Sequence, residues 1–302
     1  MSGLFDFLVI GSPYSGSTLL ANALNGHRLI ANAGELSACF PQFELGVQNP
    51  FCPLCAAKGQ PCPVWTPGFI EKVRLAGPKR ARSLFRRAVG RPVVVDSSKF
   101  PEWLDMSWEA SALAKTVVVV ISRNPFAYHV SNRRRVAAAP STSAVEWTHC
   151  YARALEWIKV HRAAHYLIRY EDFAASPEHI LTGLMEYVGL PWDPAMLRFW
   201  TEPLHALNGN AGAYMWYPEF ARSAEFERPE DASVAQGYAE RVFGGWSDEK
   251  WIGALDQHEL EMMQAGEIGD RLRQLCAVLG YDVGTLVEQA KCPASSAKRV
   301  LV

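Results

Sequence analysis

The stretch that decides the fold is FDFLVIGSPYSGSTLLANA, residues 5–23. Its apolar start, residues 5–10, predicts a buried strand, and residues 17–26 have the apolar spacing of a helix. The turn between them contains Gly11 and Gly16. A glycine-bearing loop that leads from a strand into a helix leaves backbone N–H groups free at the helix N-terminus, where the helix dipole favours negative charge. The stretch therefore predicts a site for an anionic group.

The spacing of Gly11 and Gly16 is that of the nucleoside-triphosphatase P-loop, G-x-x-x-x-G-K-[ST]. Ser17 stands where that motif has its lysine. Because that lysine reaches the β- and γ-phosphates, its absence argues against hydrolysis of ATP or GTP. Two alternatives stay open at this point: a strand–loop–helix unit that binds no ligand, and a small-molecule kinase with an altered P-loop.

The loop resembles the 5′-phosphosulfate loop of sulfotransferases that use 3′-phosphoadenosine 5′-phosphosulfate (PAPS). The family pattern is roughly P-[KR]-S-G-[ST]-T-L, and residues 13–19 read PYSGSTL. The resemblance implies that the donor is held by Pro13, Tyr14, Ser15, Gly16, Ser17 and Thr18. Tyr14 departs from the pattern, since the family usually carries lysine or arginine there. This departure keeps open a PAPS- or PAP-binding regulatory module with little catalysis.

A second phosphate motif follows the apolar run 116–122, which predicts a central parallel strand. Arg123 comes directly after it, and Ser131 lies eight positions later, about two helical turns on. Two such side chains can converge on one phosphate. In the resembled family an R-x7-S motif binds the 3′-phosphate of PAPS, so the resemblance gives Arg123 and Ser131 that role. One of the arginines at 133–135 is a further candidate. The alternative is an ordinary arginine and a solvated serine.

Two residues are candidates for catalysis. Lys99 ends the run Asp96-Ser97-Ser98-Lys99 after a predicted strand, at the edge where open α/β sheets bind ligands. Many bacterial members of the resembled family carry this run, so Lys99 is the candidate for the cation that position 14 lacks. Carbohydrate and tyrosylprotein sulfotransferases have a glutamate general base in a Gly-Glu context, which Glu35 matches. For the run 96–99 the alternative is a capping cluster for a helix that begins near residue 101. For Glu35 it is a surface glutamate that caps a helix.

Two further segments show weaker similarity to the same family, and in particular to its bacterial branch. Residues 167–173 read LIRYEDF and resemble the late strand motif L-R-Y-E-D-L, while residues 205–210 read HALNGN and resemble an H-x-x-x-G-N segment. The R-K-G segment of the cytosolic small-molecule enzymes has no clear match. The resemblance covers about residues 5–210, with a weaker echo at 246–255. It implies the fold and the donor and says little about the acceptor.

The seven cysteines are an odd number, which argues against a disulfide framework. Cys52, Cys55 and Cys62 form a dense cluster in which Cys39 is a candidate fourth member. Thiolates at C-x2-C spacing suit tetrahedral zinc, so a structural zinc ion is one interpretation. We favour buried thiols or a redox-labile loop over zinc. No metal is assigned to the reaction, because sulfuryl transfer in the resembled family needs none.

Composition limits the partners. The 302 residues are 49% hydrophobic and carry a net charge of −1, so a sizeable core is expected and nothing in the charge favours nucleic acid. The uninterrupted apolar runs are strand-sized, far below a membrane span. The N-terminus shows no signal-peptide pattern, so we expect a cytoplasmic protein with a small-molecule or carbohydrate acceptor. The oligomeric state is not indicated.

Alternating strands and helices predict an α/β fold, a P-loop-like parallel sheet with helices on both faces and irregular inserts. One domain is expected over 1–290, with a Cys-rich insert at about 49–67, a lid at about 201–247 that shapes the acceptor pocket, and a loose tail at 291–302. Core packing is the alternative for the aromatic lid region. The basic cluster at 79–91 is interpreted as a solvated face, and the alternative is a surface that attracts an acidic acceptor or partner. The expected strands are 5–10, 92–96, 116–122 and 166–170, and residues 28–32 are expected to be extended. The expected helices are 17–26, 68–76, 79–89, 101–113, 125–136, 143–165, 177–188, 193–200, 248–264 and 267–279.

The predicted function is that of a sulfotransferase, which moves a sulfuryl group from PAPS to an acceptor hydroxyl or amine and gives PAP. Glu35 takes the proton of the acceptor in this interpretation. Lys99 and the loop amides stabilise the negative charge that grows on the leaving nucleotide.

Overall fold

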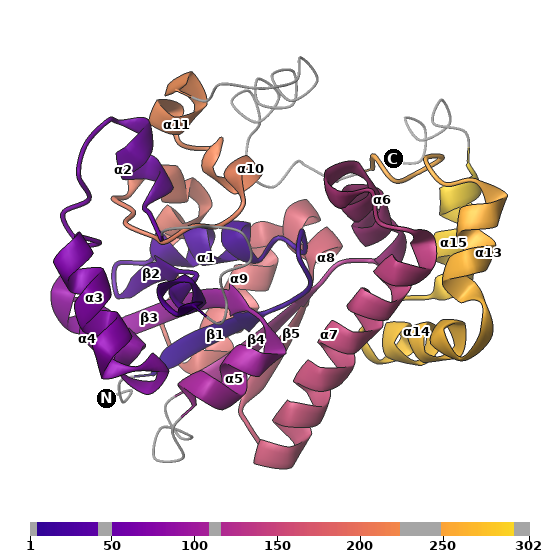
Figure 1. Ribbon diagram of the computed structural model, residues 1–302, viewed down its shortest axis with the longest axis horizontal. Coiled ribbons are helices and arrows are strands. Elements are labelled where there is room, and N and C mark those ends of the chain that lie inside the picture. The colour runs from indigo at the N-terminus through magenta and orange to yellow at the C-terminus, as the bar shows by residue number, and fades with distance from the viewer. Residues whose placement is uncertain (1–4, 42–49, 109–115, 224–248, 293–302) are drawn as a thin grey trace.

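The computed structural model describes residues 5–41, 50–108, 116–223 and 249–292. Its centre is a sheet of five parallel strands in the order β2-β3-β1-β4-β5 (Figure 1). The strands are β1 (Asp6–Ile10), β2 (Ile30–Gly34), β3 (Val93–Lys99), β4 (Thr116–Ser122) and β5 (His165–Arg169). The α/β class and the parallel sheet predicted from the sequence are confirmed. Because all five strands run the same way, their carboxyl ends meet at one edge.

The three middle strands are buried, which is why their sequences read as nearly continuous apolar runs. Alternate side chains serve opposite faces. Phe7, Val9 and Val119 pack with one cluster of core residues, and Leu8 and Val120 pack with the other. The edge strand β5 is only partly buried. The core therefore lies on both faces of the sheet, as the sequence predicts.

Helices cover both faces. The face that carries Phe7 packs with α1 (Ser17–Asn25), α2 (Pro53–Ala57), α3 (Pro67–Ala76), α4 (Pro78–Val89), α8 (Tyr170–Ala175), α9 (Pro177–Val188), α10 (Ala211–Tyr214) and the 3-10 helices η1 (Leu36–Cys39) and η4 (Pro194–Thr201). The opposite face packs with α6 (Pro125–Val136), α7 (Pro140–His161), α13 (Gln257–Gln264), α14 (Gly266–Val278) and α15 (Val283–Lys291). Helix α5 (Pro101–Ser107) contributes to both clusters.

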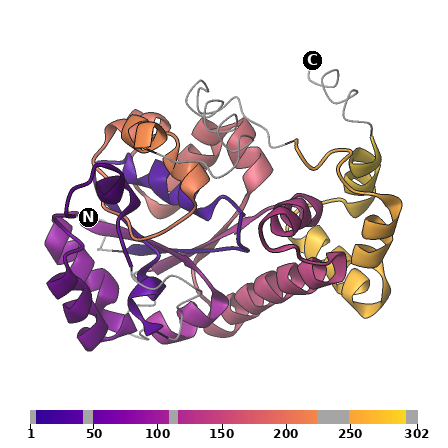
Figure 2. The same ribbon diagram turned by 45° about the horizontal axis from the view of Figure 1, so that its top comes forward.

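Helices α3 and α4 and the C-terminal helices α13 to α15 lie at opposite ends of the molecule. In Figure 1 the C-terminal helices α13 to α15, in yellow, lie beside α6 and α7, and α3 and α4 lie at the other end. Figure 2, turned by 45°, keeps the yellow helices beside α7 and away from the purple ones. None of the described helices combines the length and the apolar character that crossing a membrane requires.

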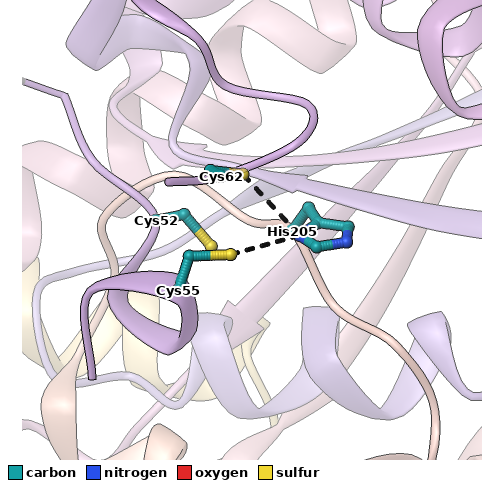
Figure 3. Close-up of side chains that lie close together, drawn as sticks. All are labelled: Cys52, Cys55, Cys62 and His205. Atoms are coloured by element: carbon teal, nitrogen blue, oxygen red, sulfur yellow. Dashed lines mark hydrogen bonds between the residues drawn. The ribbon is translucent and has the colours of Figure 1, made fainter. Parts of the chain in front are cut away.

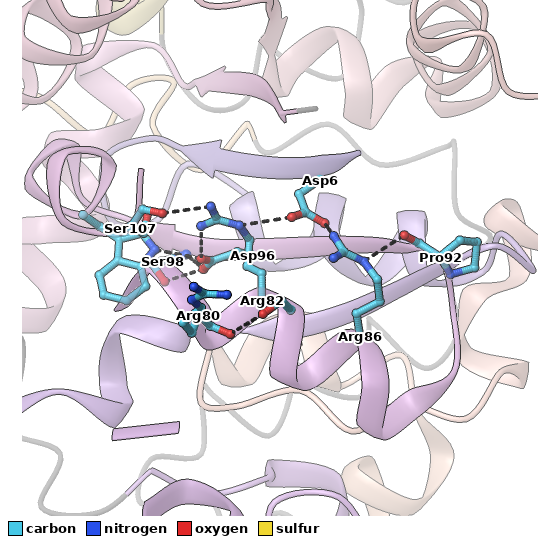
Figure 4. Close-up of polar contacts among 10 residues, drawn as sticks. Asp6, Arg80, Arg82, Arg86, Pro92, Asp96, Ser98 and Ser107 are labelled. Carbon is cyan, nitrogen blue, oxygen red and sulfur yellow. Dashed lines mark hydrogen bonds and ion pairs between the residues drawn. The ribbon is translucent and has the colours of Figure 1, made fainter. Parts of the chain in front are cut away.

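The interpretation of residues 79–91 as a solvated face is wrong for Arg82 and Arg86. Arg82 is buried, donates to Asp6 and to the Ser107 carbonyl, and forms an ion pair with Asp96 (Figure 4). Arg86 also pairs with Asp6. Charges taken out of water must be paired, and here two carboxylates on neighbouring strands β1 and β3 hold the arginines of α4. The pattern looked solvated because the partner carboxylates are remote in the sequence.

Several element boundaries differ from the expected ones. The Cys-rich insert contains the short helix α2, whose N1 position is Pro53. The expected helix 101–113 ends at Ser107, before the segment 109–115 that lies outside the described residues. The expected helix 248–264 begins only at Gln257, where Asp256 forms a capping box with Glu259. Helix α15 was not predicted, and of the expected tail 291–302 only 291–292 are described.

The described part of the expected lid, residues 201–223, holds α10 and α11 (Pro218–Ser223). Its aromatic side chains Tyr214, Trp216 and Tyr217 are buried and belong to the core cluster. The ring of Trp216 stacks on Trp200, 5.2 Å between centroids. For these residues the core-packing alternative is the observed one. Residues 224–248 of the expected lid lie outside the described residues.

Candidate active site at the carboxyl edge of the sheet

Four neighbouring strands deliver the predicted site residues to one edge of the sheet. Glu35 follows β2, Lys99 ends β3, the loop 11–16 follows β1, and Arg123 follows β4. The sheet order β2-β3-β1-β4 therefore sets these groups side by side. The arrangement arises because parallel strands all end at the same edge, and ligands of open α/β sheets bind there.

The first turn of α1 presents backbone amides that the helix itself does not use. The Leu20 amide donates to the Gly16 carbonyl at 3.0 Å, so the amides of Ser17 and Thr18 precede the helical hydrogen-bond ladder. No side chain among the described residues caps this helix. Gly16 has a φ of 90°, and a Cβ added there would lie 2.3 Å from Cδ2 of Tyr170. Both facts explain why only glycine fits at this position.

Other loop residues shape the turn. The Ser15 amide donates to the Ser12 carbonyl at 3.2 Å, and the buried Ser15 hydroxyl packs beneath Gly11, where a Cβ would lie 2.6 Å from it. Pro13 is exposed at the tip. Ser12 donates through its amide to the Tyr151 hydroxyl, which donates in turn to the Ile121 carbonyl. These contacts fix the loop between β1 and β4.

Tyr14 stands in the left-handed region with a φ of 63°. Its side chain is half-buried and packs against the core on the Leu8 face of the sheet. Burial raises the pKa of the Tyr14 hydroxyl, and the nearby positive charge of Arg135 opposes that rise. The phenol is therefore neutral at neutral pH. It cannot supply the positive charge that the resembled pattern has at this position.

Arg123 and Ser131 converge. Nη1 of Arg123 donates to the Ser131 hydroxyl at 3.2 Å and to the Tyr14 carbonyl at 2.8 Å. Its guanidinium lies over the ring of Tyr170, 5.3 Å from the centroid. The Arg123 side chain thus connects the R-x7-S motif directly to the phosphate loop. Of the arginines at 133–135, Arg133 is engaged by Glu259 and by the Ala254 carbonyl, so it serves the packing of α6.

The LIRYEDF segment supports both motifs. Tyr170 covers Gly16 and Arg123, as described above. Glu171 accepts from the amide and the side-chain Nδ2 of Asn124, at 2.9 and 3.0 Å, and from the Tyr281 hydroxyl at 2.8 Å. Asn124 in turn caps α6 through the Ala127 amide. The segment therefore fixes the start of the helix that carries Ser131.

Glu35 and Lys99 form an ion pair across the ends of β2 and β3, and their side chains are 17% and 16% exposed. Lys99 follows a bulge in β3, because its register with β1 shifts between Leu8 and Ile10. Its φ of 70° is rare for a residue with a side chain. Bulges of this kind often re-aim a side chain next to an active site. The Lys99 carbonyl accepts from the Gly11 amide at 3.3 Å, which places the lysine directly beside the loop.

Asp96 does not belong to this site. It is fully buried and accepts from Trp103 Nε1 at 2.7 Å and from Ser98. Burial raises its pKa, and the Arg82 guanidinium opposes that rise. The capping alternative for this run is wrong, since Phe100 is the N-cap of α5 and no side chain of the described residues caps that helix.

The HALNGN segment forms the wall next to the loop. Leu207 pairs with the end of β2, since its amide donates to the Ala33 carbonyl and its carbonyl accepts from the Glu35 amide, both at 2.9 Å. The Asn210 amide donates to Oγ1 of Thr18 at 3.1 Å. The Thr18 hydroxyl keeps its proton for a further acceptor. One short segment thus contacts both a candidate catalytic residue and the anion-binding helix.

Four metal-ligating side chains meet beside this wall. The ligand atoms of Cys52, Cys55, Cys62 and His205 all lie within 4.8 Å of one another (Figure 3). The expectation that Cys39 completes the cysteine cluster is wrong, because His205 takes that place and Cys39 is buried near Arg74 instead. The sequence offered a signal for His205 only as the first residue of the HALNGN segment.

A sequence model of the Sulfotransferase family matches residues 6–194. The chain belongs to the sulfotransferase family. The matched region contains the loop 11–16, Glu35, Lys99, Arg123, Ser131 and the LIRYEDF segment. A search of curated protein sequences finds no significant match.

Solved structures of sulfotransferase domains share the fold of this sulfotransferase. The sulfotransferase domain from the curacin biosynthetic pathway superposes with a TM-score of 0.60 at 17% identity, covering 93% of this chain and 99% of that domain. The sulfotransferase domain from the Synechococcus PCC 7002 olefin synthase gives a TM-score of 0.56 at 18% identity, covering 92% and 94%. At these identities the likeness establishes the fold.

Groups that suit anions lie at neighbouring strand ends of this sulfotransferase. They are the start of α1, which has no side-chain cap among the described residues, and the hydrogen-bonded Arg123–Ser131 pair. An acid–base pair, Glu35 with Lys99, lies on the other side of the loop. Sequence reasoning missed the roles of Tyr170, Glu171 and Asn210, because each acts through contacts with residues more than 45 positions away.

Proposed function

We propose that this sulfotransferase transfers a sulfuryl group from PAPS to a hydroxyl or amine of a small-molecule or carbohydrate acceptor. The observation that carries the proposal is the meeting of two anion-binding devices that the Arg123 side chain joins through the Tyr14 carbonyl. A nucleotide with a 5′-phosphosulfate and a separate 3′-phosphate requires two such devices. A nucleoside triphosphate requires the P-loop lysine, which this chain replaces with Ser17.

The residues divide between the two ends of the donor. The amides of Ser17 and Thr18 and their hydroxyls hold the 5′-phosphosulfate, with Gly16 allowing the close approach of the backbone. Arg123 and Ser131 hold the 3′-phosphate through charge-assisted hydrogen bonds. Pro13, Tyr14 and Ser15 set the shape of the loop. PAPS, when bound, supplies the sulfuryl group and leaves as PAP.

Glu35 serves as the general base, and Lys99 stabilises the leaving nucleotide. The Glu35 carboxylate accepts the proton of the acceptor hydroxyl, which as a neutral group is a poor nucleophile. The ammonium group of Lys99 stabilises the negative charge that develops on the leaving nucleotide. The ion pair between them orients both side chains, and their small exposed fractions strengthen the electrostatic contribution. Lys99 thereby supplies the positive charge that Tyr14 lacks.

Tyr14 supports a second function, a PAPS- or PAP-binding regulatory module with little catalysis. A neutral phenol stands where the family pattern has a cation, and partial burial raises the pKa of its hydroxyl. Such a module binds PAP with the affinity of an enzyme and transfers no sulfuryl group. The experiment for the proposed function must therefore measure binding and turnover separately.

The test uses calorimetry and labelled donor. We expect calorimetry to show that the wild-type protein binds PAP and does not bind ATP with magnesium. With labelled donor, we expect transfer of ³⁵S from PAPS to at least one member of a panel of phenols, alcohols, amines and saccharides. Lys99→Ala should lower turnover by about 100- to 1000-fold, while Lys72→Ala, an exposed change on α3, should not. Binding of PAP without any transfer favours the regulatory module. Binding of ATP with magnesium in place of PAP contradicts both functions and favours a kinase.

A further inference from the structure

We infer that Cys52, Cys55, Cys62 and His205 bind a structural zinc ion. The inference goes beyond the proposed function, since no step of sulfuryl transfer uses these residues. Three cysteines come from the insert before α3 and the histidine comes from the wall segment 205–210. The residues meet through tertiary folding, because about 150 positions separate His205 from the cysteines.

The distances match those of a tetrahedral zinc site. The Sγ atoms of Cys55 and Cys62 lie 3.5 and 3.6 Å from Nδ1 of His205 (Figure 3). With zinc–sulfur bonds of about 2.3 Å and zinc–nitrogen bonds of about 2.0–2.1 Å, tetrahedral angles separate sulfur and nitrogen ligands by roughly 3.5–3.6 Å. One nitrogen and three sulfurs within 4.8 Å of one another are a closed Cys₃His set with no position left for substrate.

The surroundings orient the ligands. The Trp65 amide donates to Sγ of Cys62 at 3.3 Å, and Trp65 Nε1 donates to the His205 carbonyl at 2.6 Å. One residue thus supports two ligands from distant segments, as the outer shell of a metal site does. The Trp65 ring is fixed by stacking on Phe85, with centroids 5.1 Å apart. Three thiolates and an imidazole favour zinc over magnesium or calcium, which take oxygen ligands.

The zinc ion would hold the active-site wall. His205 is two residues from Leu207, which pairs with the backbone of Glu35, and five residues from Asn210, which donates to Thr18. Residues 50–66 contain little regular structure besides the five-residue helix α2. A metal ion that links this insert to His205 therefore adds a rigid connection between the insert and the wall segment 205–210.

The decisive experiment is metal analysis of the 302-residue chain, purified without a histidine tag. Mass spectrometry of the dialysed wild type should give about one zinc per chain. Cys55→Ser and His205→Ala should each lose most of it, and His205→Cys should retain it because a fourth thiolate preserves the tetrahedral set. Cys276→Ser is the matched control, since Cys276 is a buried thiol outside the cluster. Exchange into Co²⁺ should give the strong visible d–d absorption of tetrahedral thiolate coordination.

Two results overturn the inference. One is a wild-type protein that contains less than a tenth of an equivalent of zinc and also fails to take up Co²⁺. A protein in which two of these cysteines form a disulfide, and which therefore binds neither metal, gives the same result. The other is zinc that persists in Cys55→Ser and His205→Ala, since that metal lies elsewhere. The wild-type measurement stands even where a variant fails to fold. Metal content is independent of PAP binding, so this inference and the proposed function fail separately.

Discussion

Replacing Arg123 with alanine tests the assignment of the 3′-phosphate site. PAP and adenosine 5′-monophosphate differ by the 3′-phosphate alone, so each variant yields two affinities whose ratio isolates that group. Nη1 of Arg123 already donates to Ser131 and to the Tyr14 carbonyl, so the guanidinium is positioned before a ligand arrives. A positioned side chain requires little ordering on binding, which leaves most of the interaction free energy for affinity.

The expected magnitude follows from these contacts. A hydrogen bond to a charged group contributes about 1.5–3 kcal/mol. At about 1.4 kcal/mol per tenfold, Arg123→Ala should weaken PAP binding by about 10- to 150-fold beyond its effect on the monophosphate. The variant also removes the contact to the Tyr14 carbonyl, so some loss for both nucleotides is expected. Ser131→Ala leaves that contact intact and should weaken PAP alone, by about 1 kcal/mol or about fivefold.

Isothermal titration calorimetry with both nucleotides measures these affinities, and Arg87→Ala, an exposed change on α4, is the control. The reasoning is refuted if Arg123→Ala weakens PAP and the monophosphate by the same factor. In that case the guanidinium stabilises the loop and has no specific partner in the 3′-phosphate.

Three other perturbations have defined outcomes. Glu35→Gln should lower turnover by about 100- to 10,000-fold and leave PAP affinity within about threefold. The control Glu186→Gln, an exposed change on α9, should change neither quantity. Equal turnover in the two variants would show that Glu35 is not the base. Gly16→Ala should lower the free energy of unfolding by about 2–4 kcal/mol, because φ is 90° and the Tyr170 ring blocks a Cβ. The control is Gly68→Ala, because no heavy atom lies within 4 Å of a Cβ added there. It should change the free energy of unfolding, measured by urea titration, by less than about 1 kcal/mol. Burial lowers the pKa of His27 below 6.5 in the folded protein, so as the pH falls His27 is protonated in the unfolded chain before it is protonated in the folded one. The free energy of unfolding should therefore fall as the pH drops below 6.5, by up to about 1.4 kcal/mol per pH unit. His27→Gln should flatten that slope in urea titrations at several pH values, and an unchanged slope would exclude His27 as its source.

The strands and the order of the site residues could be predicted from the sequence. Runs such as Val93–Val95 and Thr116–Ser122 are apolar throughout because the strands are buried on both faces, and this pattern is local. The pairing of Arg123 with Ser131 is also local, since both lie within one strand end and one helix. Local periodicity and spacing determine such features, so no partner from elsewhere in the chain is needed to recognise them.

Features that depend on distant partners could not be predicted. Arg82 looked solvated because its carboxylates, Asp6 and Asp96, are brought to it only by the sheet. His205 joins the cysteines for the same kind of reason, and Cys39, which is nearer in sequence, does not. The ion pair between Glu35 and Lys99 requires the order of β2 and β3, which a sequence pattern does not encode.

The most direct test of the central claim is a crystal structure of this sulfotransferase with PAP. The account predicts the 5′-phosphate within hydrogen-bond distance of the Ser17 and Thr18 amides and the 3′-phosphate between Arg123 and Ser131. Density for PAP elsewhere on the chain, or with the 3′-phosphate away from Arg123, would contradict it.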